Sequence, residues 1–216
     1  MSTLSELRQF VRIEISDHSI SDDDINNALN AVLKKVAGGV VYAEIGNLSP
    51  PLPELLKTDG EIDADYSDAF VDMPDDYQRD LIFCRNSTEK LIVSDSFLDF
   101  MNKYPTLDDS GGVSEVCVQG RKFYYQGLPT TYETLYVHYY RYPDTLSSDS
   151  DTPEGIPERL HKDILVPGAC DHLTPSDHPK KSAWIMLVNK GIADLVSIIG
   201  RDEEAVNMDD DTEYCD

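Results

Sequence analysis

The sequence predicts an α+β fold: a helical bundle of about four helices, with a small antiparallel β insertion between the second and third helices. Near both ends of the chain, apolar residues recur at the 3.6-residue period of an amphipathic helix, whereas in the middle they recur at every second position, as in a strand. An extended arm and an acidic C-terminal tail complete the prediction. The expected parts are an N-terminal helix hairpin over 1–45, an extended arm or loop over 46–70, a β-rich insertion over 71–143, C-terminal helices that complete the helical domain over 144–200, and the acidic tail over 201–216.

Two helices are predicted at the N-terminus, and the short turn between them should pack them as a hairpin. Thr3 and Glu6 have the spacing of a capping box at the start of the first helix. Ser21 is placed to cap the second helix, and the aspartates that follow it suit the positive end of a helix dipole. The apolar stripes of the two helices are Leu4, Leu7, Val11 and Ile15, and Ile25, Leu29, Val32 and Val36.

The segment from Gly46 to about Phe70 is rich in Pro, Asp and Gly and shows little periodicity. We interpret it as the extended arm. A segment of this length without structure of its own is uncommon inside a compact domain unless it has a function. Reaching a neighbouring subunit is one such function, and an ordinary surface connection is the alternative.

Between Asp75 and Tyr142, short runs rich in β-branched and aromatic residues predict the small antiparallel sheet. Gly120 suits a hairpin turn between two of these runs, because glycine tolerates a positive φ angle. Residues 96–104 are predicted to form one short helix on the sheet. The last strand has apolar or aromatic residues on both faces, so we expect both faces to be covered. The runs are 81–83, 91–93, 116–118, 123–125 and 134–142.

After a stretch rich in Ser, Asp and Pro over 143–157, helical periodicity returns. Pro157 suits the first turn of a helix, and Leu160 and Ile164 begin its apolar face. Because proline lacks a backbone N–H and glycine weakens a helix, Pro167-Gly168 should kink or break this helix.

The final helix has the most regular apolar pattern. Ser176 or Asp177 can cap it, with Pro179 in its first turn. Its apolar stripe consists of Trp184, Val188, Gly191, Leu195 and Ile199. Beyond Gly200 the chain is too acidic to bury a core of its own, so the tail is predicted to become ordered only against a partner.

The formal net charge of −23 argues against adhesion to DNA phosphates or anionic membranes, which requires positive potential. Assembly would then need apolar contact area or counter-charge on the partner. We expect a cytosolic site of synthesis, because no apolar run approaches the roughly 20 residues of a membrane span and the N-terminus lacks a signal-peptide pattern. The widely spaced Cys84, Cys117, Cys170 and Cys215 form no CxxC pair, which is typical of thiols in a reducing compartment.

Alternating acidic residues make one candidate calcium site, which consists of Asp59, Glu61, Asp63 and Asp65. The pattern departs from an EF-hand loop, because Ala64 stands where glycine is needed and Phe70 stands where a bidentate acid is needed. Surface carboxylates therefore explain this segment better than a metal site does.

A second candidate metal site combines Cys170, His172 and His178, with His161 a turn or more away. The spacing Cys-x-His-x5-His is not that of a zinc finger, so ordinary residues at helix ends are the favoured interpretation. No nucleophile elbow, Cys–His signature or phosphate-binding glycine loop is recognisable. The sequence therefore predicts no catalytic residue, no metal, no cofactor and no enzymatic activity.

An aromatic run over 132–142 could stack nucleic-acid bases, but the basic groove that normally accompanies such stacking is missing from the pattern. The sheet core and a subunit interface are the favoured locations for these rings. The residues are Tyr132, Tyr136, Tyr139, Tyr140 and Tyr142.

The residues at the joints of this organisation resemble a known family, the head-to-tail adaptors (connector or head-completion proteins) of tailed bacteriophages. The resemblance spans roughly 70–165. It rests on Pro74-Asp75-Asp76-Tyr77-Gln78-Arg79, Tyr104-Pro105 before Gly111, Gly120 with Phe123, Thr134-Leu135, Tyr139-Tyr140-Arg141, Pro143, Leu146, Pro153 through Pro157, Leu160 and His161.

This resemblance implies a structural virion protein located in the neck, between the capsid portal and the tail. Its copies would form a ring, typically a dodecamer of about twelve subunits, that extends the DNA channel and serves genome packaging and ejection. The implied partners are other copies of the chain, the portal protein and tail or nozzle proteins, while double-stranded DNA passes without specific binding. An acidic lumen would repel DNA phosphates over about 10 Å in ordinary salt.

Three alternatives remain open at this stage. The chain could be another phage neck or tail-completion component. An acidic, DNA-mimic-like regulatory protein would use the same charge to occupy a basic site on its partner, without forming a ring. A metal-assisted hydrolase would require stoichiometric metal at one of the two candidate sites.

Overall fold

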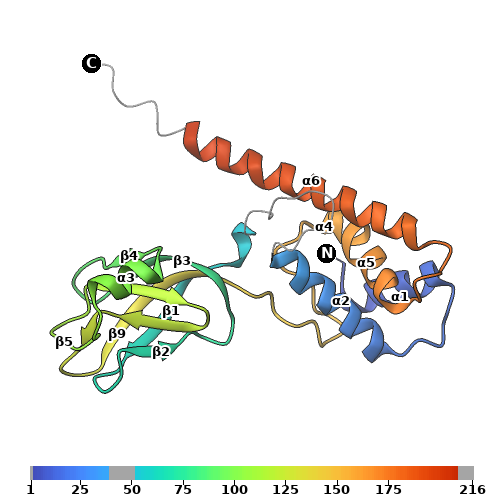
Figure 1. The fold of residues 1–216 in the computed structure, drawn as a ribbon. Helices are drawn as coiled ribbons and strands as arrows, with labels where there is room; N and C mark the ends of the chain where they lie inside the picture. The colour runs from blue at the N-terminus through green and yellow to red at the C-terminus, as the bar shows by residue number, and fades with distance from the viewer. Residues whose placement is uncertain (1, 39–51, 209–216) are drawn as a thin grey trace, which may run out of the picture. The chain divides into compact units, whose positions relative to one another are not determined.

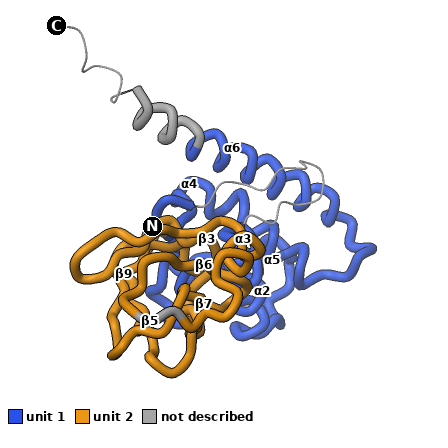
Figure 2. The backbone as a smooth tube through the Cα atoms, turned by 60° about the vertical axis from the view of Figure 1, so that its left-hand side comes forward, with its two compact units in different colours: residues 1–55, 143–216 blue, residues 56–142 orange. Residues whose placement is uncertain are grey.

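The computed structural model describes residues 2–38 and 52–208, and it separates the chain into two compact units (Figure 2). Residues 1–55 and 143–216 form a helical unit, and residues 56–142 form a β unit. Each unit buries an apolar core of its own. Residues 46–51 of the predicted arm and residues 209–216 of the predicted tail lie outside the described residues.

The helical unit begins with α1 (Leu4–Ile15) and α2 (Asp22–Ala37), followed by a 3₁₀ turn at Pro53–Leu55. Both predicted caps are confirmed: Thr3 and Glu6 form a reciprocal capping box, and Ser21 accepts a hydrogen bond from the backbone N–H of Asp24. The three aspartates at the start of α2 lie in its first turn, as predicted from the helix dipole. The predicted apolar stripes of both helices face the core of this unit.

The C-terminal half of the helical unit contains α4 (Glu158–Leu160), a π-helical segment (His161–Leu165), α5 (Val166–Leu173) and α6 (Lys181–Met208) (Figure 1). In the π-helical segment the backbone N–H of Val166 donates to the carbonyl of His161, five residues earlier. Pro167 has no N–H to continue the α-helical ladder, so the chain widens one turn before it instead of breaking. The predicted disruption at Pro167-Gly168 thus takes the form of a π-bulge.

The helix α6 contacts both α5 and the π-helical segment through one apolar face. Its residues 181–199 are long and apolar enough for a membrane span by length and composition alone, with a mean hydropathy of 1.4. The tryptophan of this segment, Trp184, is nevertheless buried in the core of the helical unit, and the indole N–H donates to Glu14. Packing in the core explains one face of this segment, of which 33% is buried, while Met186 and Leu187 on it are exposed.

The β unit contains three sheets. β1 (Leu56–Ala64), β9 (Glu133–Arg141) and β3 (Tyr77–Arg85) form a three-stranded antiparallel sheet with β9 in the centre. β2 (Phe70–Asp72), β7 (Lys122–Tyr125), β6 (Glu115–Gln119) and β4 (Ile92–Ser94) form a four-stranded sheet in that order. β5 (Asp109–Ser110) pairs with β8 (Gly127–Leu128), and α3 (Phe97–Lys103) follows β4.

The predicted hairpin turn at Gly120 is confirmed, because Gly120 has φ of +64° between paired β6 and β7. The two larger sheets bury their facing sides in one core, which includes Phe123 and Tyr125 from β7 and Val137 and Tyr139 from β9. Gly60 of β1 permits the closest approach in this core, because a Cβ there would lie 2.7 Å from the ring of Tyr139.

The prediction of a four-helix bundle with a small antiparallel β insertion is wrong. The β part is a compact unit with its own core, and two of its strand pairs, β4 with β6 and β5 with β8, are parallel. It is larger than predicted because Leu56–Ala64, expected within the arm, forms β1. The Asp and Gly residues of β1 are uncommon in strands, so the sequence pattern did not indicate a strand there. Its strand conformation depends on pairing with β9.

Candidate interaction surfaces

The acidic residues of the candidate calcium site lie along β1 and its end. Asp63 accepts a hydrogen bond from the hydroxyl of Thr134 at 2.8 Å, and Asp65 accepts one from the backbone N–H of Ser67. Their oxygens are thus used in local hydrogen bonds. Among residues 2–38 and 52–208, no group of three or more His, Cys, Asp or Glu side chains is arranged to hold a metal ion.

The residues of the candidate zinc site serve packing and local hydrogen bonds. Cys170 is buried, and this burial raises the pKa of its thiol to about 12. The imidazole Nε2 of His161 lies 2.7 Å from the carbonyl of Ile156, and the ring of His178 stacks on Trp184 with centroids 4.8 Å apart. These contacts account for Cys170, His161 and His178 without a shared ion, and His172 is exposed on α5.

The aromatic run of β9 divides between the two faces of the three-stranded sheet. Tyr139 lies in the core, and its hydroxyl donates to Asp76 at 2.7 Å. Tyr136 and His138 lie on the opposite face and are half-buried. The expectation that both faces of this strand are covered is therefore wrong for the β unit, whose outer face is partly open to a partner.

The outer face of this sheet carries opposite charges on its two sides. On the β3 side, the guanidinium of Arg85 lies 4.5 Å from the ring centroid of Tyr136, and the ammonium of Lys90 lies 5.4 Å from that of Phe83. On the β1 side, Glu61 pairs in register with Tyr136.

At one end of the three-stranded sheet, Asp76 is hydrogen-bonded to residues of β1 and β9 and to Tyr142, which follows β9. Its carboxylate accepts hydrogen bonds from Tyr139 at 2.7 Å and from the ammonium of Lys57 at 2.8 Å, and its carbonyl accepts one from Tyr142. Burial opposes ionisation of Asp76, but these donors outweigh it and lower the pKa of the carboxyl. Asp76 and Tyr139 are both among the residues on which the family resemblance rests. The structure shows that they are in direct contact and that their role is structural.

A second exposed aromatic patch lies on the outer side of the four-stranded sheet. The ring of Tyr124 contacts Phe70 of β2 and Phe97 of α3, with centroid distances of 5.7 and 4.9 Å. The ammonium of Lys122 lies 3.8 Å from the centroid of Phe70. Because Phe70 and the neighbouring Leu98 are 38% and 70% exposed, this patch offers apolar area to a partner.

The comparisons with known proteins give a family. The family model described as SU10 adaptor protein matches residues 2–210, which is nearly the whole chain. The chain belongs to this family. It is therefore a phage adaptor protein and a component of the virion. A search of curated proteins found no match to this adaptor.

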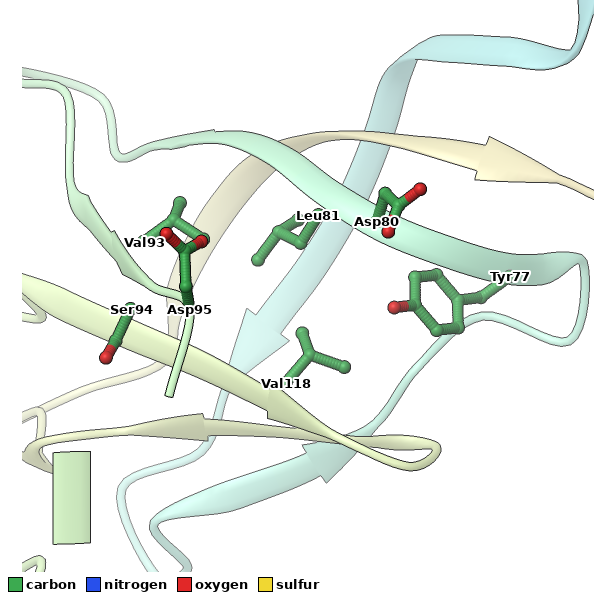
Figure 3. Close-up of a pocket in the computed structure, with 7 residues that line it drawn as sticks. All are labelled: Tyr77, Asp80, Leu81, Val93, Ser94, Asp95 and Val118. Atoms are coloured by element: carbon green, nitrogen blue, oxygen red, sulfur yellow. The ribbon is translucent and has the colours of Figure 1, made fainter. Parts of the chain in front are cut away.

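The adaptor also has a pocket of about 250 Å³ in its β unit (Figure 3). Tyr77, Asp80 and Leu81 come from β3, Val93 and Ser94 come from β4, Asp95 follows β4, and Val118 comes from β6. Asp80 has a φ of +53° at an irregularity in the pairing of β3 with β9. An irregularity in strand pairing changes the direction in which nearby side chains point. The sequence pattern did not indicate the irregularity at Asp80.

Proposed function

We propose that this adaptor forms a ring of about twelve copies beneath the portal, where it extends the DNA channel and connects the capsid to the tail. The observation that carries the proposal is the family match over nearly the whole chain. Genome packaging and genome ejection would both use this channel. Its role is structural, and it carries out no catalysis.

The surfaces of the β unit support assembly with copies of the same chain. A ring requires a heterologous interface, in which two different surfaces of each copy meet. The outer face of the three-stranded sheet offers a basic side at Arg85 and Lys90 and an acidic side at Glu61. The aromatic patch around Tyr124 adds apolar area that can offset repulsion between strongly acidic copies.

The net charge of −23 is consistent with passage of DNA through the ring. An acidic wall repels phosphates at short range, so the genome can slide instead of binding. The acidic residues near the C-terminus, over 201–216, of which 201–208 continue α6, are proposed to contact the portal or a neighbouring copy.

Electron microscopy of the adaptor co-expressed with its portal protein tests this function. We expect a ring stacked coaxially on the portal, with the DNA channel continuous through both. A discrete small particle that never joins a portal would refute the proposal and favour an acidic regulatory protein instead.

A charge exchange tests the sheet surface separately. Arg85→Glu and Glu61→Arg should each weaken ring formation, and the double variant should restore it, because opposite charges face each other again in the altered interface. Native mass spectrometry measures the assembly. Equal loss in the double variant and in the single variants would refute the pairing of Arg85 with Glu61 across the interface. Unchanged assembly of the single variants would remove this face from the interface, while leaving the ring itself to the microscopy experiment.

A further inference from the structure

The pocket at Tyr77 is built from groups of two kinds. Asp80 and Asp95 contribute a carboxylate each to its lining, on opposite sides of Leu81 in Figure 3, whereas Leu81, Val93 and Val118 are its apolar lining residues. Its volume of about 250 Å³ is below the roughly 300–1,000 Å³ of most small-molecule sites. A pocket of this size suits one side chain better than a whole metabolite.

Tyr77 supplies an independent sign that the pocket has a ligand. The residue is only 8% exposed, and its ring is held against that of Tyr139 at 5.6 Å between centroids. Its hydroxyl points into the pocket, yet it has no hydrogen-bond partner within the described part of the chain (Figure 3). A hydroxyl without a partner in the protein can both donate to and accept from a bound group. Burial and the charge of Asp80 raise the pKa of Tyr77, which keeps the hydroxyl protonated.

We propose that this pocket binds the guanidinium group of an arginine side chain from a neighbouring copy of the adaptor. Two carboxylates and a hydroxyl match the several N–H donors of a planar guanidinium, and the apolar walls match the aliphatic part of the side chain. A calcium ion would need about six to eight oxygen ligands and would gain nothing from the three apolar walls. An ammonium is a more strongly hydrated point charge, so lysine fits less well.

Among the arginines whose side chains the structure describes, Arg159 is the one that is free to act as the occupant. It is exposed on α4, and it has no hydrogen bond, ion pair or ring contact among the described residues. Every other arginine whose side chain is described has a partner of its own within the chain: Arg8 and Arg12 have aspartates, Arg79 has Asp80 at 3.7 Å, Arg85 has a tyrosine ring, Arg121 has Asp75, and Arg141 has the carbonyl of Tyr142. The assignment of this occupant rests on the proposed ring.

The chemistry of the pocket can be tested without assembly, by titrating Nα-acetyl-arginine methylamide into the Arg159→Ala variant of the full chain. Methyl NMR signals of Leu81, Val93 and Val118 should shift and saturate, whereas the neutral citrulline analogue should bind at least tenfold more weakly. In the Arg159→Ala background, Asp80→Asn and Asp95→Asn should each weaken binding by about tenfold, because each removes a charge-assisted hydrogen bond. Asparagine at 80 keeps the left-handed backbone, since it tolerates positive φ.

Matched controls separate this binding from general attraction to an acidic protein. Glu89→Gln removes one exposed negative charge of the same unit outside the pocket and should leave the affinity unchanged. Tyr77→Phe keeps the core ring and removes only the hydroxyl, so it should weaken binding several-fold. Equal binding of the arginine and citrulline compounds, or signals that respond to calcium chloride alone, would overturn the guanidinium assignment.

The occupant is tested in the assembled protein. Arg159→Ala should lower the fraction of chains in rings, and ethylguanidinium at millimolar concentration should restore it only when Asp80 and Asp95 are intact. Rings that form equally well without Arg159 would exclude it as the occupant. Failure of the wild-type chain to form rings would refute the proposed function and the second-copy occupant together, whereas the titration would still decide the chemistry of the pocket.

Discussion

Replacing Gly168 by alanine should destabilise the helical unit, although alanine is the better helix former. An added Cβ at this position of α5 would lie 2.8 and 3.0 Å from the two γ-carbons of Val32 in α2. Overpacking of this kind costs about 1–3 kcal/mol, while the gain in helix propensity is about 1 kcal/mol. Because Val32 is β-branched, few rotamers can relieve the contact. We expect a net loss of up to about 2 kcal/mol in the free energy of unfolding.

A double-mutant cycle identifies the cause of this loss. Val32→Ala removes both γ-carbons and should cost about 2 kcal/mol alone, because it leaves a small cavity. In that background Gly168→Ala should become neutral or stabilising by up to about 1 kcal/mol, since the new methyl group enters the vacated space. The expected coupling between the two positions is therefore up to about 3 kcal/mol.

The assay is denaturant unfolding followed by the fluorescence of Trp184. This residue is the single tryptophan of the chain, and it is buried in the helical unit, so its emission reports that unit rather than the β unit. Stabilisation by Gly168→Ala in both backgrounds would show that contact with Val32 does not limit this position.

Three further predictions concern buried polar groups and thiols. Asp76→Ala should destabilise the β unit by about 1–3 kcal/mol, because it leaves the hydroxyl of Tyr139 and the ammonium of Lys57 without their acceptor; near-ultraviolet circular dichroism of the tyrosines measures it. Desolvation lowers the pKa of His161, so the neutral imidazole is the form that the fold favours. The stability of the helical unit should therefore be independent of His161 above pH of about 6.5 and fall as the pH drops below it, as measured by unfolding at several pH values. Iodoacetamide at pH 8 should label the described thiols only after unfolding, because burial raises their pKa; they are Cys84, Cys117 and Cys170.

Each of these predictions has a discriminating control. Asp75→Ala changes the neighbouring exposed carboxylate and should have little effect on the β unit. His161→Gln should flatten the pH profile between 6.5 and the lower pKa of the native imidazole, and an unchanged profile would assign the pH dependence to another group. Peptide mapping of the labelled protein identifies each thiol, and rapid native labelling of any of the three would contradict its burial.

The sequence by itself determined the two N-terminal helices, their caps at Thr3 and Ser21 and the hairpin turn at Gly120, because these depend on interactions between residues close along the chain. The cap predicted for the last helix at Ser176 or Asp177 is wrong, because α6 begins at Lys181. It also indicated the family, through residues at structural joints. Asp76 and Tyr139 illustrate why such residues recur, since a hydrogen bond between them joins segments far apart in the sequence.

Only the tertiary structure decided that the β part is a unit with its own core and that part of the predicted arm is strand β1. Strand formation by Leu56–Ala64 depends on non-local pairing with β9, which local propensity does not encode. The pocket at Tyr77 was invisible for the same reason. Its walls come from β3, β4 and β6, and its carboxylates, Asp80 and Asp95, are brought together by the packing of two sheets and by a local irregularity in the pairing of β3 with β9.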